Sequence, residues 1–265
     1  MKLFISADIE GTCGIAAWQE TNTDNQYSKY FETQMSNEVA AACRGAMRAG
    51  FDEIVIKDAH DTARNILPDL LPENVKLLRG WPGNPYCMLS GIDDTFDAVF
   101  YTGYHSAAST SGNPLSHTMH TQIGQIRING IVTSEFYIGA LTASYLSVPS
   151  ALLTGDKLLC ETSAGLLPSL RTVAVSEGFG NGSLSLQPSY ACRLIEEKAY
   201  EALSGDYKKG VFTMPGSFTV EVQYNRHFDA YSASFYPGCE RTDDRTVRFE
   251  CKDWYEALRM MHFTL

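Results

Sequence analysis

The chain has 265 residues, of which 44% are hydrophobic and 20% are charged, as in a globular protein with one large or two smaller domains. Its formal net charge of −10 at pH 7 argues against nucleic-acid and anionic-membrane partners, because both attract proteins through basic patches. No run of about 18 apolar residues indicates a membrane span, and we expect no signal peptide at the start.

Apolar runs and helical spacing predict alternating strands and helices in the first half of the chain. KLFISAD is interpreted as a buried strand closed by Gly11, residues 27–49 as a helix with Gly50 as its stop, and DEIVIKDAH as a second strand. FDAVFYTGYH is interpreted as a third strand. A strand, a long helix and a strand in this order predict a βαβ crossover and a mainly parallel sheet.

The following segments predict a change of architecture. Asn129-Gly130 in QIRINGIVTSE predicts a hairpin, followed by a helix from near Glu135 and a buried strand at SALLTGD. The Gly/Ser-rich stretch FGNGSLSLQPS is a candidate boundary. Beyond it we expect a helix at about 189–204, β-rich segments around FTVEVQY, SASFYP and RTVRFEC, and a last helix at WYEALRMMHF. We therefore expect an α/β domain at residues 1–180 and a smaller α+β domain at residues 181–265.

The seven cysteines are scattered along the chain, and none of them forms a CxxC motif. An odd number of isolated cysteines is typical of free thiols in a reducing compartment, and is unlike a disulfide framework or a zinc ribbon. We therefore expect a cytoplasmic protein. Cys13 lies close in sequence to acidic residues, but its spacing fits no ligand pattern and favours a buried thiol.

The predicted strands end in acids and histidines. Asp8 and Glu10 follow the first strand, Asp58 and His60 the second, and His105 the third. Because ligands of an open parallel sheet bind beyond the carboxyl ends of its strands, these side chains should meet at one edge. Taken alone, an acid at a strand end more often lies in a turn or caps a helix, and a histidine there is more often hydrogen-bonded within the fold. Asp58 could equally cap a turn or orient the imidazole of a metal ligand. Their combination favours a metal site.

A long loop of small polar residues, GYHSAASTSGNPLSHTMHTQIG, runs from Gly103 to Gly124 and holds three of the six histidines. Loops of this length without secondary structure are usually functional or disordered. His117 and His120 could share one face of a helical turn, or could be incidental in a solvated loop. Glu135 at the predicted helix start suits an interaction with the helix dipole as well as metal ligation.

Carboxylate and imidazole ligands without thiolates suit zinc or another divalent transition metal in a catalytic site. A single catalytic zinc with an open position needs fewer ligands than this set provides. The set instead suits a two-metal site in which one carboxylate bridges the ions.

The segments SADIEG, KDAH, GYHSAAST and LSHTM, together with Glu135, resemble the DppA-type D-aminopeptidases, a family of dinuclear zinc enzymes. The resemblance runs in good order from residue 1 to about 156 and more loosely to the C-terminus, and the chain departs from the family around Cys13, Trp18 and Gln19. It implies that His117 is the catalytic histidine and that Asp8 is the bridging carboxylate. The metal ligands that the resemblance implies are Asp8, Glu10, His60, His105 and Glu135.

The resemblance also implies a Rossmann-like three-layer α/β domain joined to a smaller α+β domain, a pair of Zn²⁺ ions in each chain, and a ring-shaped homodecamer. The implied reaction is hydrolysis of short peptides with a free N-terminal D-residue, in which His117 assists as acid or base. A two-metal amidase or phosphoesterase stays open as a rival, although no P-loop or Lys/Arg cluster accompanies the ligands. A non-catalytic peptide-binding metalloprotein is a second rival. A dinucleotide enzyme is disfavoured, because no GxGxxG follows the first strand.

Overall fold

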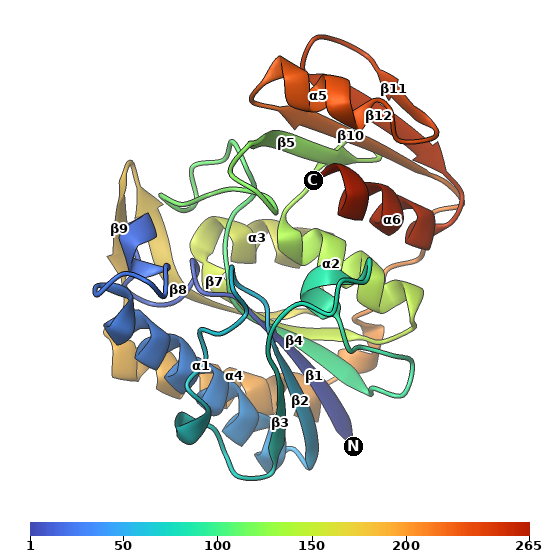
Figure 1. Ribbon diagram of the computed structural model, residues 1–265. Helices are drawn as coiled ribbons and strands as arrows, with labels where there is room; N and C mark the ends of the chain where they lie inside the picture. Colours follow the sequence, from blue (N-terminus) through green and yellow to red (C-terminus); the bar gives the residue numbers. More distant parts are fainter.

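The computed structural model describes residues 1–265 and contains a larger and a smaller β-sheet (Figure 1). The larger sheet consists, in spatial order, of β3 (Val75–Leu78), β2 (Glu53–Asp58), β1 (Lys2–Ala7), β4 (Ala98–Tyr104), β7 (Ser150–Asp156), β8 (Arg171–Phe179) and β9 (Gly182–Ser185). All neighbouring strands are parallel except β8 and β9, which form an antiparallel hairpin. The predicted mainly parallel sheet is therefore confirmed.

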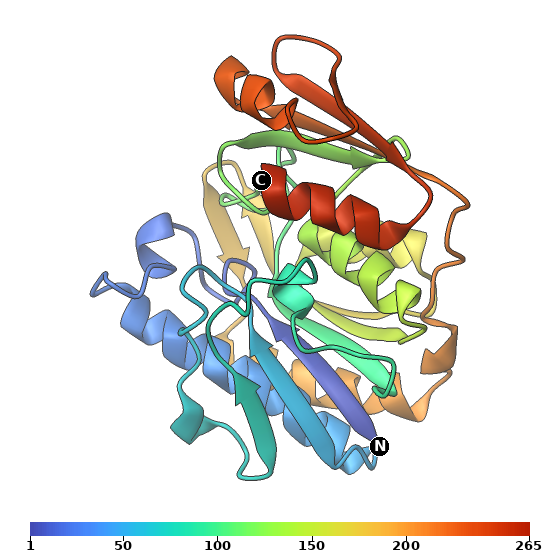
Figure 2. The same cartoon turned by 45° about the vertical axis from the view of Figure 1, so that its right-hand side comes forward.

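Helices cover both faces of the larger sheet (Figure 1 and Figure 2). One face carries α1 (Ser28–Arg48) and α4 (Pro188–Ser204), and the other carries α2 (Glu135–Tyr145) and α3 (Lys157–Leu166). Leu3 and Ile5 of β1 belong to the first of these cores, whereas Phe4 belongs to the second, because successive strand residues point to opposite faces. A strand covered on both sides needs a continuous apolar run, and KLFIS provides it. This is the predicted three-layer α/β architecture.

The smaller sheet is antiparallel and lies beside α2 (Figure 2). Its strands, in spatial order, are β11 (Cys239–Arg241), β12 (Thr246–Cys251), β10 (Phe218–Tyr224), β5 (Ile123–Ile128) and β6 (Ile131–Val132). Helices α5 (His227–Ala233) and α6 (Trp254–Thr264) complete its core, which also includes Tyr137 and Leu141 of α2. The Trp254 indole N–H donates to Thr142 Oγ1 at 3.1 Å, so α6 joins the smaller sheet to the larger unit.

The two sheets do not divide the chain at the expected boundary between residues 180 and 181. Strand β9 and helix α4 lie after that boundary yet belong to the larger unit, whereas β5 and β6 lie before it yet belong to the smaller sheet. The Gly/Ser-rich stretch forms the β8–β9 hairpin, with Gly180 at a φ of +60°, and the start of α4. A division of the chain into separately folding units stays a prediction.

Most other predicted elements are present. Asn129 and Gly130 form the two-residue hairpin turn between β5 and β6 with φ values of +50° and +82°, and α2 starts at Glu135. The β-rich prediction for SASFYP is wrong, because α5 extends to Ala233 and a turn follows it. The edge strand β3 was not predicted from the sequence, since its four residues are too few to show a period.

Two glycines allow the ends of β1 and β4 to run close together beyond the strands. Asp8 N donates to Thr102 O and Gly11 N donates to Gly103 O, both at 2.8 Å. Gly103 has a φ of +67°, and a Cβ atom there would lie 2.2 Å from Asp8 O. A Cβ atom at Gly11 would lie 1.8 Å from Tyr104 O. Glycine at both positions therefore permits the approach of the segments that carry Asp8 and His105.

No helix of the chain has the length and apolar character needed to cross a membrane.

We expect Gly103→Ala to lower the free energy of unfolding by about 2–4 kcal/mol, because the new methyl group meets backbone in a left-handed conformation. Urea unfolding measures the change. The matched control is Gly165→Ala in α3, where a Cβ atom has nothing within 4 Å and the change should stay within about 1 kcal/mol. Equal effects of the two substitutions would contradict the role given to Gly103.

Candidate metal centre

Four elements of the fold bring the predicted ligands together beyond the carboxyl ends of the central strands of the larger sheet. Asp8 and Glu10 follow β1, His60 follows β2, His105 follows β4, and Glu135 is the first residue of α2. All five residues are buried. The structure thus brings together side chains that lie as far apart as residues 8 and 135 in the sequence, and the meeting of strand ends at a sheet edge explains why.

The two oxygens of the Asp8 carboxylate face two different groups. Asp8 Oδ1 lies 3.3 Å from His60 Nδ1, which is also 3.0 Å from Glu10 Oε2. Asp8 Oδ2 lies 3.4 Å from His105 Nε2, which is also 3.1 Å from Glu135 Oε2. Each triad of two carboxylates and one imidazole has the composition and proximity of a metal site, and the two triads share Asp8.

The distances and the unpartnered atoms fit metal ions. Ligand atoms about 2.0–2.2 Å from a tetrahedral zinc lie roughly 3.3–3.6 Å apart, close to the separations within the triads. Asp8 Oδ2, Glu10 Oε2 and His105 Nε2 are buried and have no hydrogen-bond partner. Buried polar atoms are normally satisfied, so these three atoms are accounted for if each contacts a cation.

Backbone carbonyls orient the three imidazoles. His60 Nε2 donates to Thr21 O at 3.0 Å, His105 Nδ1 to Ser106 O at 3.0 Å, and His117 Nδ1 to Leu115 O at 2.9 Å. In each ring the opposite nitrogen faces the carboxylates, and in the neutral ring it carries the lone pair that a metal ion needs, as around metal-binding histidines. These acceptors could not be predicted from the sequence, because every residue type provides a backbone carbonyl.

Asp58 does not contact the His60 ring. Its carboxylate accepts hydrogen bonds from Asn65 N at 2.6 Å, Asn65 Nδ2 at 2.9 Å and Ile66 N at 2.8 Å, so Asp58 caps the turn that follows β2. Asn65 Nδ2 also donates to His60 O at 2.7 Å. Asp58 therefore fixes the backbone of His60, while Thr21 orients its imidazole.

The loop between β4 and β5 contributes its backbone to the site. Met119 N donates to Glu135 Oε1 at 2.7 Å and thereby aims the other oxygen of Glu135 at His105. Met119 has a φ of +65°, and His120 N donates to Thr118 O at 2.7 Å, so Met119 is the central residue of a strained γ-turn. The prediction that His117 and His120 could share one face of a helical turn is therefore wrong.

His117 belongs to neither of the triads that share Asp8, although with Glu10 and His105 it forms a third, looser group of possible ligands. Its ring stacks on His105 with centroids 4.2 Å apart and an interplanar angle of 11°, and Trp18 contacts its ring edge-on at 5.2 Å. His117 Nε2 is 3.6 Å from Glu135 Oε1 and 3.9 Å from Glu10 Oε1, longer than the separations within the triads. This position suits a group that acts on a bound molecule beside the metal ions.

Without metal, burial and neighbouring charges shift the pKa values of the clustered residues in different directions. Burial, reinforced by the neighbouring Glu10 carboxylate, raises the pKa of Asp8. Burial lowers the pKa of His105, but Glu135, Glu10 and Asp8 outweigh it and hold that pKa well above its ordinary value. The pKa of His60 is raised in the same way, chiefly by Glu10 after burial is overcome. Burial and the adjacent His105 lower the pKa of His117, which is therefore neutral near pH 7.

The triads lie in a cavity of about 470 Å³. Four of the five ligand candidates line it, whereas His105 lies behind them; the lining also includes His117, Trp18, Asp61, Trp81 and Thr121. Trp81 is held by its indole N–H, which donates to Asp61 O at 2.6 Å. The cavity is large enough for a short peptide segment and exposes the side of the triads on which His117 lies.

Comparison with known proteins identifies the family. A family model described as D-aminopeptidase matches residues 1–263. The chain belongs to the D-aminopeptidase family. A D-aminopeptidase of Bacillus subtilis (strain 168) is 30% identical over 265 residues, which cover 98% of this chain and 95% of that protein.

A solved structure agrees with the fold of the chain. It is that of the Zn-dependent D-aminopeptidase DppA from Bacillus subtilis, described as a self-compartmentalizing protease. The TM-score is 0.93 at 28% identity, and the match covers 100% of this chain and 96% of that chain. The predicted membership of the DppA-type family and the predicted fold class are therefore confirmed.

We expect Asp8→Asn to abolish binding at both metal positions, because Asp8 is the residue that the triads share. The zinc content of the purified protein should fall from about two ions per chain to below about 0.5. Asp61→Asn, which changes a carboxylate in the same cavity outside the triads, should leave the content near two. Elemental analysis after dialysis measures both variants, and an Asp8→Asn protein that keeps either ion in full would contradict the shared carboxylate.

Proposed function

We propose that this chain is a zinc-dependent D-aminopeptidase that hydrolyses short peptides with a free N-terminal D-residue. The observation that carries the proposal is the buried Asp8 carboxylate, whose two oxygens face separate imidazoles, each of which also faces a second carboxylate. Family membership and the Zn-dependent relative support the same reaction. The residues proposed to hold the zinc ions are Asp8, Glu10, His60, His105 and Glu135.

The chain's own residues prepare the proton transfers of the reaction. Bound zinc ions supply Lewis acidity for the scissile carbonyl and lower the pKa of the attacking water. The N–H at His117 Nδ1 donates a hydrogen bond to Leu115 O, so Nε2 is free to accept the proton of the attacking water. His117 then delivers a proton to the leaving amine. Because its pKa is lowered, His117 is unprotonated near pH 7 and can act first as a base.

The lining of the cavity favours a peptide with a free amine over a phosphate ester. It includes four acidic residues, Asp8, Glu10, Asp61 and Glu135, and no lysine or arginine. Phosphate recognition commonly uses Arg or Lys, which this lining lacks. Asp61 is the acid that the triads leave free, and it is a candidate partner for the substrate amine.

We further propose that the chain forms a homo-oligomer, a decamer if it follows its family. A self-compartmentalizing relative supports assembly of copies. Phe228, Tyr231, Phe235 and Phe263, on or beside α5 and α6, are more than half exposed, and such exposed aromatic groups mark contact surfaces. Sedimentation as a 29.3 kDa monomer at micromolar concentration would contradict this proposal. The assignment to the cytoplasm stays a prediction that rests on the scattered cysteines.

We expect His117→Ala to lower kcat for D-Ala-D-Ala by about 10²–10⁴-fold while the zinc content stays unchanged, because His117 moves protons and lies outside the triads. The unmodified enzyme should cleave D-Ala-D-Ala faster than L-Ala-L-Ala and should lose this activity on chelation. His227→Ala, an exposed histidine of α5, is the matched control and should keep full activity. Full activity of His117→Ala would overturn its catalytic role.

A further inference from the structure

A second cavity, of about 180 Å³, adjoins the metal centre. It shares Cys87, Met119 and His120 with the cavity that contains the triads, so the two spaces meet at these side chains. The rest of its lining is mainly apolar and comes from α2, from the C-terminal helix α6 and its end, and from the segment before Cys87. These residues are Pro85, Ile138, Leu258, Met261, His262 and Leu265.

The strained turn at Met119 stands between the two spaces. The Met119 N–H holds Glu135, while the Met119 side chain lines both the metal cavity and the apolar cavity. A non-glycine residue at positive φ costs folding free energy, and such residues persist where the surrounding structure holds them in place for function. The turn therefore fixes a proposed metal ligand and the boundary of the apolar cavity at the same time.

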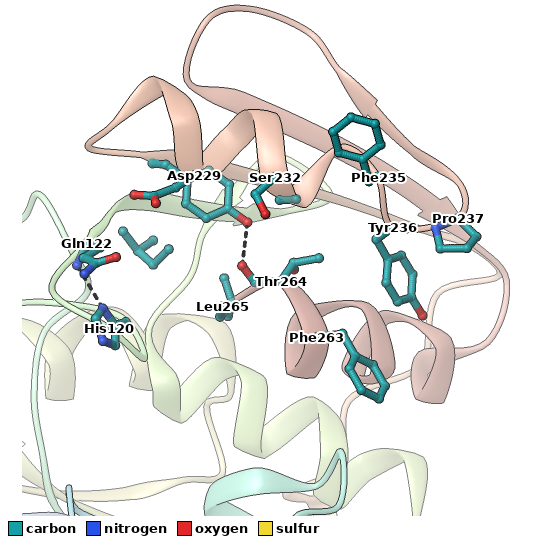
Figure 3. A pocket seen from close by; sticks show the side chains of 13 residues that line it. His120, Gln122, Asp229, Ser232, Phe235, Tyr236, Pro237, Phe263, Thr264 and Leu265 are labelled. Carbon is teal, nitrogen blue, oxygen red and sulfur yellow. Dashed lines mark hydrogen bonds between the residues drawn. The ribbon is translucent and has the colours of Figure 1, made fainter.

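The apolar cavity adjoins a larger space, which Figure 3 shows. This outer cavity has a volume of about 510 Å³ and shares His120 and Leu265 with the apolar one. Polar groups such as Gln122, Asp229 and Ser232 line it. The three spaces adjoin one another in the order metal cavity, apolar cavity and outer cavity, which suits an extended ligand with an apolar group near the metal centre.

We propose that the apolar cavity is a specificity subsite that takes the apolar side chain of a peptide residue flanking the scissile bond. The inference rests on the proposed function, since it requires a peptide bond to be held at the metal centre. Because one water occupies about 30 Å³ of the liquid, the cavity has room for a side chain of several heavy atoms. A leucine side chain fits this description, whereas an alanine methyl group leaves most of the space unused.

The test narrows the cavity and compares small with large substrates. Ile138 and Ile131 are both partly buried against the core of the smaller sheet, but only Ile138 lines the cavity. The zinc-loaded variants Ile138→Phe and Ile131→Phe are assayed on D-Ala-D-Ala, D-Ala-D-Leu and D-Leu-D-Ala. Ile138→Phe should lower kcat/KM for one leucine peptide by at least about 10-fold, mainly through KM, and leave D-Ala-D-Ala within about threefold.

The pattern of losses identifies the position of the bound residue. Loss on D-Leu-D-Ala alone assigns the cavity to the N-terminal residue, and loss on D-Ala-D-Leu alone assigns it to the residue after the scissile bond. Ile131→Phe should leave all three peptides within about threefold of the unmodified enzyme. If Ile138→Phe does not fold, Leu265→Trp narrows the same cavity from the last residue of the chain and should give the same selective loss.

Three outcomes overturn the subsite. The first is an equal loss on all peptides with a folded variant, the second is no loss on either leucine peptide, and the third is an unmodified enzyme that cleaves D-Ala-D-Ala but neither leucine peptide. All three leave the aminopeptidase function intact. An unmodified, zinc-loaded enzyme that cleaves no peptide at all would instead overturn the proposed function and the subsite with it.

Discussion

Burial of the Asp8 carboxylate at the carboxyl end of β1 makes its negative charge unfavourable unless neighbouring groups neutralise it. His60 approaches one oxygen and His105 the other, and each imidazole faces a further carboxylate, Glu10 or Glu135. Three buried acids exceed the charge of two imidazolium groups, and without metal the raised pKa of Asp8 favours a further proton there. Divalent cations would take the place of these protons. Metal binding and the packing of this sheet edge are therefore coupled.

The strand ends bring the ligands together, and the segments beyond them set the ligand geometry. The Thr21 carbonyl holds the ring of His60 from the loop after β1, and the Met119 N–H holds Glu135 from the loop after β4. Trp18, only three residues before Thr21, packs on His117. Changes in these loops can therefore alter catalysis or substrate choice while the sheet and the ligand set stay the same.

The sequence predicts the parts of this arrangement that depend on local patterns. Apolar runs locate β1, β2 and β4, and the acids and histidines that follow them indicate a metal site. The shared role of Asp8 was predicted from the family resemblance alone, and the pairing of the other ligands into triads is seen only in the structure. Long-range pairing was less accessible, because β5 pairs with β10 across about 90 residues, and the turn signals near residue 180 mark a hairpin as readily as a boundary. The hydrogen bond to the carbonyl of Thr21 and the γ-turn at Met119 could not be predicted, because neither requires a particular type of residue.

The most direct test of the shared carboxylate is crystallographic diffraction from the zinc-loaded protein on both sides of the zinc absorption edge. We expect two anomalous peaks in each chain, one beside Glu10 and His60 and the other beside His105 and Glu135, with an oxygen of Asp8 contacting each. A single peak, or a peak coordinated by His117 in place of one triad, would contradict this expectation.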